Sequence, residues 1–353
     1  MPTAMHLNLR VDPTQYIPQI REVPGYDYIH LVRQPKYMTD LSLLNEKVFY
    51  LSEIFSPKEF AANNKVSLLH AHHGQLGILL LPFKEETKLP LVTSIRGRDA
   101  TLGKQPVGYL GNMKMLFEKG DHFYPVCQYL ADRIISWGCP PEKVKVLYGG
   151  VDLSKYHYKA PKSDGSQNIL SVGRLIEKKG HHVLMKAFQK IKDKFPNATL
   201  TIIGKGELKG ELTSLASQLN LGDSFRLLDH LHKDKVREYM ARADLFCAAS
   251  MEAANGDLEG IPNTLKEAMA LGVPVVSTNH AGIPELISHK KEGFLVQENN
   301  SYELAEALEF MLNETCLWDT YTKAARKKVE KLFDSEQQLR LQAKYYDELL
   351  GGR

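Results

Sequence analysis

Short apolar runs alternate with amphipathic stretches along most of this chain. The runs are rich in Val, Ile, Leu and Phe, which is typical of strands buried in a parallel sheet, and the stretches between them have helical spacing. The predicted strands cover residues 28–32, 67–70, 91–95, 122–126, 144–148, 169–172, 199–203, 225–228, 245–248 and 275–278. Predicted helices include residues 128–137, 181–195, 211–219, 234–243 and 264–270.

This alternation predicts an α/β protein with two doubly wound, Rossmann-like domains whose parallel strands end at a shared cleft. The pattern breaks at residues 153–168, a polar segment with Pro and Gly that we interpret as a linker. We therefore expect an N-terminal domain at 1–152 and a C-terminal domain at 169–333. A last helix at 335–349, within residues 334–353, would pack back on the first domain.

Composition narrows the class of protein. The chain has 353 residues, 43% of them hydrophobic, and a net charge of +3, which is too small to indicate a nucleic-acid partner. Four cysteines lie far apart and form no Cys-x-x-Cys pair, as expected for reduced thiols. No apolar stretch has the length of a signal peptide core or a membrane span, so we expect a cytoplasmic protein, with docking on a membrane surface left open.

The stretch GDLEGIPNTLKEAMALGVPVVST, from Gly256 to Thr278, combines an acidic Gly/Pro turn with a helix start. Pro262 suits a first helical turn, and Asn263 or Thr264 would cap or open the helix. The free N–H groups of residues 260–264, which include Gly260 and Ile261, would form a positive pole suited to a phosphate.

Two carboxylates flank this pole. Glu259 precedes it and Glu267 lies more than a turn inside the helix, so each could accept hydrogen bonds from sugar hydroxyls on opposite sides of a diphosphate. The arrangement indicates a nucleotide-sugar donor. On this stretch alone, the alternative is a pair of carboxylates that merely stabilise the helix start.

Several motifs together resemble the family-four retaining glycosyltransferases of the GT-B fold. EGIPNTLKE with AMALGVPVVST and AGIPELI resembles the family's E-x7-E region, and NILSVGRLIEKKGHHVLMKAF resembles its donor-phosphate segment. LTIIGKGELKGEL, ADLFCAAS and EGFLV also fall where the family has them. The similarity covers nearly all of residues 168–296.

The resemblance implies a role for each matching residue. Glu259 resembles the carboxylate that contacts the donor hexose, and Glu267 the one that holds the ribose. Arg174 and Lys179 would stabilise the charge that develops on the departing diphosphate. The alternative for these two cations is plain surface solubility. No Asp-x-Asp pair is present to hold a metal, so the resemblance implies a metal-independent retaining transfer without a cofactor.

The N-terminal half resembles the family less closely. PTQYIPQIREV, which contains Thr14 and Gln15, is similar to the first loop of the capsular and exopolysaccharide branch, and implies a saccharide or lipid-linked acceptor. HAHHG holds His72 near the expected cleft. Its histidines could suggest a metal, but no carboxylate or Cys follows at ligand spacing, so a loop-and-turn role is favoured.

IRGRDAT departs from the family pattern, because Arg96 stands where relatives carry a histidine near the donor sugar. Arg96 could pair with the diphosphate or an anionic acceptor, or only with Asp99 or another acid; Asp99 fits a structural or acceptor-side role.

The donor base stays open, because His230 and Leu231, which could face the base, do not discriminate uridine from guanosine. Gly204-Lys-Gly206 imitates a dinucleotide fingerprint, but the gap to Gly210 is one residue too long for a dehydrogenase. Two closer alternatives are an epimerase or hydrolase of the same fold and a non-catalytic nucleotide-sugar binder.

Overall fold

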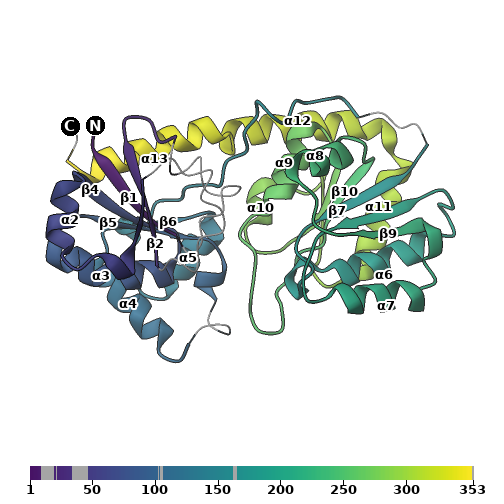
Figure 1. Cartoon of the computed structure of the whole chain (residues 1–353). Coiled ribbons are helices and arrows are strands. Elements are labelled where there is room, and N and C mark those ends of the chain that lie inside the picture. Colours follow the sequence, from purple (N-terminus) through teal and green to yellow (C-terminus); the bar gives the residue numbers. More distant parts are fainter. Residues whose placement is uncertain are drawn as a thin grey trace. The chain divides into compact units, whose positions relative to one another are not determined.

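The chain folds into two compact units, each built on one six-stranded sheet. The computed structural model describes residues 1–8, 20, 22–33, 47–101, 103, 106–161 and 165–351. The first unit comprises Met1–Tyr148 and Glu336–Arg353, and the second comprises Gly149–Ser335 (Figure 1). Both sheets are parallel, which confirms the predicted α/β class with two doubly wound domains.

The sheet of the first unit has the order β3-β2-β1-β4-β5-β6. Its central strand β1 (Thr3–Asn8) is buried along its whole length, as expected for a strand that is covered on both faces. The other strands are β2 (Asp27–Val32), β3 (Val48–Tyr50), β4 (Val66–Ala71), β5 (Leu91–Ile95) and β6 (His122–Pro125). The helices are α2 (Pro57–Asn63), α3 (Gly74–Thr87), α4 (Tyr109–Lys119) and α5 (Gln128–Ser136).

The last helix, α13 (Ser335–Leu349), packs into the first unit. Its buried residues Leu339, Ala343 and Tyr346 join a hydrophobic cluster with residues of the sheet such as Leu68 and Val92. The expected C-terminal helix therefore forms over the expected residues and contributes core to the N-terminal sheet.

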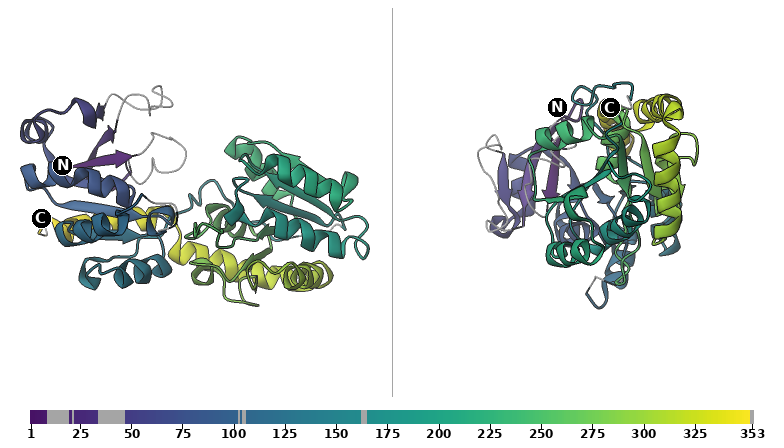
Figure 2. Two further views of the ribbon diagram at one scale, coloured as in Figure 1. Left: turned by 90° about the horizontal axis from the view of Figure 1, so that it is seen from below. Right: turned by 90° about the vertical axis from the view of Figure 1, so that its right-hand side faces the viewer.

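The sheet of the second unit has the order β12-β11-β10-β7-β8-β9. The strands are β7 (Asn168–Val172), β8 (Thr199–Ile203), β9 (Phe225–Leu228), β10 (Leu245–Ala248), β11 (Val275–Thr278) and β12 (Phe294–Val296). The helices are α6 (His181–Ile191), α7 (Lys209–Gln218), α8 (Lys233–Ala241), α9 (Asn263–Leu271), α10 (Ile283–Leu286), α11 (Ser301–Asn313) and α12 (Trp318–Leu332). Figure 2 shows that helices cover both faces of this sheet.

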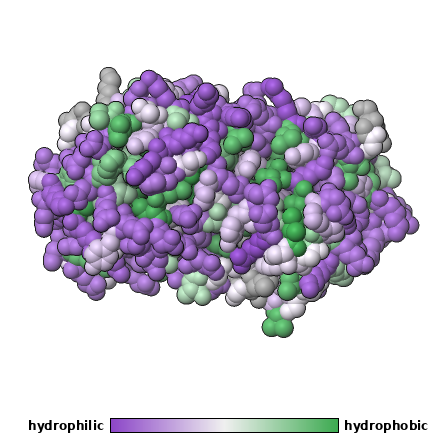
Figure 3. Space-filling view, turned by 180° about the vertical axis from the view of Figure 1, so that it is seen from behind, coloured by the Kyte–Doolittle hydropathy of each residue, from purple (hydrophilic) through white to green (hydrophobic). Residues whose placement is uncertain are grey.

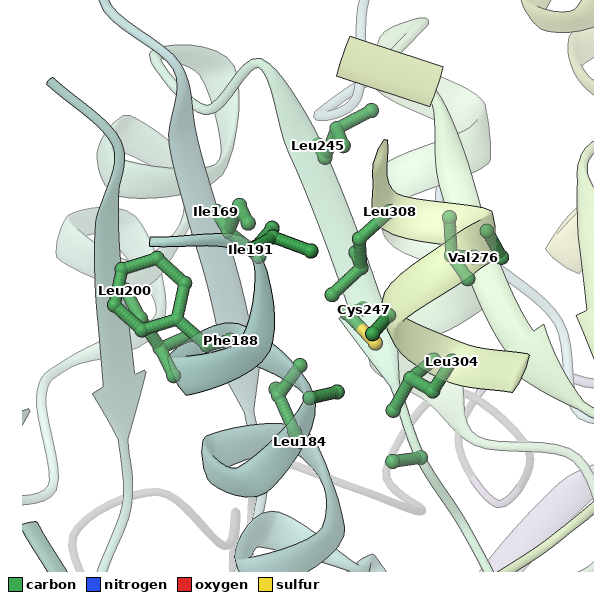
Figure 4. Close-up of a cluster of buried hydrophobic side chains, with 14 of the residues drawn as sticks. Ile169, Leu184, Phe188, Ile191, Leu200, Leu245, Cys247, Val276, Leu304 and Leu308 are labelled. Carbon is green, nitrogen blue, oxygen red and sulfur yellow. The ribbon is translucent and has the colours of Figure 1, made fainter. Parts of the chain in front are cut away.

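The core of the second unit lies between the sheet and helices α6 and α11. Leu184 and Phe188 of α6 meet Leu304 and Leu308 of α11 over Cys247 of β10 (Figure 4). This is the apolar face that the helical periodicity of both segments predicts.

Apolar side chains are largely enclosed in this way. On the face shown in Figure 3, hydrophilic residues predominate and apolar ones form small scattered groups. None of the helices among the described residues combines the length and the hydropathy needed to cross a membrane.

Three details differ from the sequence predictions. The predicted strand at 144–148 forms one parallel bridge, from Val144 to Phe123, and two backbone hydrogen bonds to β6, from Lys145 N–H to Phe123 O (2.9 Å) and from Leu147 N–H to Pro125 O (3.0 Å), but not a regular strand. Strands β1, β3 and β12 were missed: β1 because His6 and Asn8 interrupt its apolar pattern, and the other two because they have only three residues each. The described part of the predicted linker at 153–168 lies within the second unit, where Lys159 N–H donates to Leu271 O (3.0 Å) and Arg326 donates to Tyr156 O (2.6 Å).

Candidate functional site

The candidate site lies at the carboxyl end of the second unit's sheet. Thr264 Oγ1, in the first turn of α9, donates a hydrogen bond to Val172 O at the end of β7 (3.1 Å). Beside it, the end of β8 approaches the β7 loop closely: a Cβ built on Gly204 would lie 1.9 Å from Gly173 O. Carboxyl ends of parallel strands are where doubly wound folds bind ligands.

Glu259 forms the centre of this site, between two lysines. Its Oε2 lies 3.2 Å from Lys179 Nζ, and its Oε1 lies 3.3 Å from Lys178 Nζ. Both lysines belong to the short 3₁₀ helix η5 (Glu177–Lys179), and Glu259 is 13% exposed. The fold thus brings together Glu259 and Lys179, which are far apart in the sequence.

Opposing effects set the charge of this carboxylate. Burial alone would raise the pKa of Glu259, but the charges of Lys179, Lys178 and Arg174, with the hydrogen bond from Lys179, lower it to about 2. Glu259 is therefore ionised over the whole physiological range and can act only as a hydrogen-bond acceptor.

A histidine fixes the backbone of the same residue. The N–H of Glu259 donates to His280 Nε2 (3.2 Å), so the ring proton of His280 is on Nδ1, which faces Glu298 Oε2 at 2.5 Å. Burial lowers the pKa of His280, which keeps the ring neutral as this acceptor role requires. Glu298 itself lies in the loop before α11.

The start of α9 differs slightly from the expectation. Helix α9 begins at Asn263, and Pro262 is its N-cap residue without a side-chain cap, so Pro262 lies before the first turn and neither Asn263 nor Thr264 caps the helix. Gly260 is buried, and its carbonyl accepts from Gly282 N–H (3.2 Å). The segment 260–264 nevertheless leads into the helix with no side chain occupying its N–H groups as a cap.

Glu267 lies on α9, where it is partly buried. Burial raises the pKa of Glu267, opposed by Lys233 and by a hydrogen bond with the Tyr156 hydroxyl. Arg174 is exposed after β7, and His230 and Leu231 follow the carboxyl end of β9. All the predicted donor-side residues thus belong to the second unit, either in loops that follow strand ends or on α9.

Sequence reasoning missed three participants: Lys178, His280 and Tyr156. The motif that assigns a role to Lys179 assigns none to the adjacent Lys178. No motif assigns a role to His280 or Tyr156, and only folding brings them to Glu259 and Glu267.

In the first unit, Asp99 has a structural role. Its carboxylate accepts from the backbone N–H of Arg96 (2.8 Å) and from Gly74 N–H at the start of α3 (3.1 Å), with His73 Nδ1 3.5 Å away. Burial would raise the pKa of Asp99, but His73 and these N–H groups lower it. Asp99 therefore joins the end of β5 to the start of α3.

Arg96 contacts a histidine. Its Nη2 lies 3.1 Å from His72 Nδ1, and because a guanidinium can only donate, His72 carries its proton on Nε2 and donates to His6 Nδ1 (2.9 Å). Burial lowers the pKa of both rings, so both are neutral.

Two histidines of the HAHHG motif, His70 and His72, lie close to His6 of β1, while His73 faces Asp99 instead. Ligand atoms of His6, His70 and His72 lie within 4.8 Å of one another. However, His70 is hydrogen-bonded to Tyr346 and Ser94, and the adjacent cationic Arg96 opposes a metal ion. Thr14 and Gln15 lie outside the described residues.

Comparisons with known proteins agree with this geometry. Residues 154–328 match the family "Glycosyl transferases group 1", and residues 11–155 match "Glycosyltransferase Family 4". The amylovoran biosynthesis glycosyltransferase AmsK of Erwinia amylovora is 33% identical over 289 residues, which is 80% of this chain and 71% of AmsK. The putative colanic acid biosynthesis glycosyltransferase WcaL of Escherichia coli K12 is 35% identical over 75% of this chain and 66% of WcaL.

Solved structures share the fold at lower identity. Anabaena Alr3699/HepE in complex with UDP matches with a TM-score of 0.81 and 20% identity, over 99% of this chain and 100% of that chain. Sucrose-phosphate synthase from Thermosynechococcus elongatus matches with a TM-score of 0.82 and 16% identity, over all of both chains. The chain therefore belongs to the family-four glycosyltransferases of the GT-B fold, in the branch that includes enzymes of exopolysaccharide biosynthesis.

Proposed function

We propose that the chain is a retaining hexosyltransferase, which moves a hexose from a nucleoside-diphosphate sugar to a saccharide or lipid-linked acceptor without a metal ion. One observation carries the proposal: an ionised Glu259 lies against Lys179 beside the start of α9. An acceptor of hydrogen bonds, a cation and free helix N–H groups are what a hexose attached to a diphosphate requires.

Each group has a defined part in this reaction. The bond from the anomeric carbon to the diphosphate breaks, and Lys179, Arg174 and the helix start stabilise the charge that builds on the leaving group. Glu259 accepts hydrogen bonds from the hexose and orients it. Glu267, with Tyr156, would receive the ribose hydroxyls. The acceptor oxygen bonds to the anomeric carbon on the face that the diphosphate leaves, and the leaving phosphate accepts the proton of that hydroxyl, so the configuration is retained.

Relatives narrow the first substrates to test. HepE was crystallised with UDP and with UDP-glucose, and a Campylobacter jejuni relative, 32% identical over 66% of this chain, is named for transfer to a diphospho-undecaprenol-linked sugar. Uridine donors and polyprenyl-diphosphate acceptors are therefore the first pair to use, and a peripheral contact with the membrane would follow from the second.

The test is a thermal-shift screen against nucleoside diphosphates and their sugars, followed by product analysis with saccharide and lipid-linked acceptors. We expect one nucleotide to stabilise the protein and the product linkage to keep the donor's anomeric configuration by NMR. Glu259→Ala should reduce turnover at least about 100-fold while nucleotide affinity is kept. Release of free sugar without an acceptor would indicate a hydrolase or epimerase instead, and binding without any turnover would indicate a nucleotide-sugar binder.

A further inference from the structure

Lys178 is a buried cation for which the proposed chemistry has no direct use. Its side chain is 6% exposed, against 16% for Lys179. Its Nζ donates to Asp257 Oδ1 (3.1 Å) and to Leu258 O (2.9 Å), and lies 3.3 Å from Glu259 Oε1. Two hydrogen-bond acceptors therefore hold the ammonium, and its charge lies beside Glu259 Oε1, a buried oxygen for which the described residues provide an ion pair but no hydrogen bond.

The backbone of Lys178 is fixed as firmly as its side chain. Its carbonyl accepts from Met251 N–H (3.0 Å), and Gly180, with φ +60°, lies so close to the end of β10 that a Cβ there would be 1.8 Å from Ala249 O. The preceding Glu177 accepts from Ala254 N–H (3.0 Å). Helix η5 therefore attaches to the loop before α9 at each of its three residues.

The two lysines differ in what a ligand would do to them. A bound diphosphate attracts the more exposed Lys179 and weakens its hydrogen bond to Glu259. Lys178 cannot follow, because Asp257 and Leu258 hold it. Without a second cation, the burial of Glu259 would then favour its protonated form.

We propose that Lys178 is a positioning residue, which keeps Glu259 ionised and oriented while Lys179 moves its contact to the diphosphate. This inference rests on the proposed function for the identity of the ligand. Lys178 itself would touch neither the diphosphate nor the hexose.

Proton uptake on UDP binding tests whether Lys178 keeps Glu259 ionised while Lys179 contacts the diphosphate. Isothermal titration at pH 6 in buffers of different ionisation enthalpy gives the number of protons taken up per UDP bound. In the wild type Glu259 stays ionised, so the number of protons taken up is the number that UDP alone takes up. In Lys178→Met, Glu259 gains a proton as Lys179 leaves it, and we expect an additional uptake of about 0.5–1 proton per site.

Four further variants make the result specific. Glu259→Gln in the Lys178→Met background should remove the additional uptake, and Lys178→Arg should restore the wild-type count. Lys186→Met, which removes an exposed charge from α6, should behave as the wild type. Asp257→Asn should also keep the wild-type count, because Lys178 remains beside Glu259. UDP affinity of Lys178→Met should stay within about threefold of the wild type.

Equal proton counts in the wild type and Lys178→Met would overturn the proposal, as would an Asp257→Asn variant that reproduces the Lys178→Met count. If the wild type binds neither UDP nor any other nucleoside diphosphate, the proposed function fails. In that case acid unfolding tests whether Lys178 keeps Glu259 ionised. The contribution of Glu259 to the free energy of unfolding is measured against Glu259→Gln, in the wild type and in Lys178→Met. We expect this contribution to be lost at a pH at least about one unit higher in Lys178→Met than in the wild type.

Discussion

At the scale of single residues, the site depends on which cations lie beside Glu259 and which of them can contact a ligand instead. Glu259 is partly buried yet ionised because two lysines and Arg174 outweigh the cost of burial. Of the two lysines, Lys179 is the one that a diphosphate can reach, since 16% of its side chain is exposed against 6% for Lys178. The same contact therefore serves two anions in turn, the carboxylate in the free protein and the phosphate in the complex.

This exchange predicts the effect of Lys179→Ala. The variant loses a charge-assisted contact to the diphosphate, so we expect UDP affinity to fall about tenfold or more. Isothermal titration with UDP measures it, and Lys190→Ala, in an exposed position at the end of α6, is the matched control. Unchanged affinity in Lys179→Ala would remove this residue from the diphosphate site.

At the scale of elements, the sequence predicted the strands that are continuous, mainly apolar runs. Strands β7 to β11 are short runs with clear boundaries, and each formed within one residue of its expected limits. Strand β1 could not be found this way, because His6 is a buried polar residue inside it, bonded to His72. A polar side chain in this pattern predicts an exposed position, and only the hydrogen bond to His72 in the folded structure explains why His6 is buried.

The residues of the candidate site likewise differ in whether the sequence could identify them. Glu259, Glu267, Arg174 and Lys179 could be named because they share motifs whose spacing the family keeps. Lys178 and His280 could not, since their roles come from contacts between loops that follow different strands. Periodicity and motif spacing describe one element at a time, so they do not predict contacts between elements.

Close contact between the β7 and β8 loops gives a prediction at this scale. In Gly204→Ala the new Cβ would meet the carbonyl of Gly173 at 1.9 Å, so the loop must shift, and we expect a loss of about 3 kcal/mol in the free energy of unfolding of the second unit. Gly210→Ala is the matched control: a Cβ there meets nothing within 4 Å, and its place in α7 predicts a gain of about 0.5–1 kcal/mol. Urea unfolding measures both, and equal values for the two variants would contradict the close approach.

At the scale of the whole molecule, the chain leaves the first unit at Tyr148 and returns to it at Glu336. The return supplies core: Tyr346 is fully buried, hydrogen-bonded to His70 (2.5 Å) and Gln342 (2.8 Å), and packed against Tyr26 and Tyr124. The N-terminal sheet is therefore completed by the last residues of the chain, and the second unit has its core within one continuous segment.

This chain path predicts that a C-terminal substitution acts on the N-terminal sheet. Tyr346→Ala should cost the first unit about 3–5 kcal/mol, because it leaves a cavity and an unsatisfied His70, and the second unit should be unaffected. Hydrogen exchange by mass spectrometry resolves the two: protection should fall in β1, β4 and β5 and stay in β7 and β10. Tyr302→Ala, on α11 and 70% exposed, loses an exposed contact with the Lys190 ammonium and should change neither unit by more than about 1 kcal/mol. UDP binding by Tyr346→Ala should persist, since the donor-side residues belong to the second unit, and a parallel loss of protection in both sheets would show that the two units do not unfold independently.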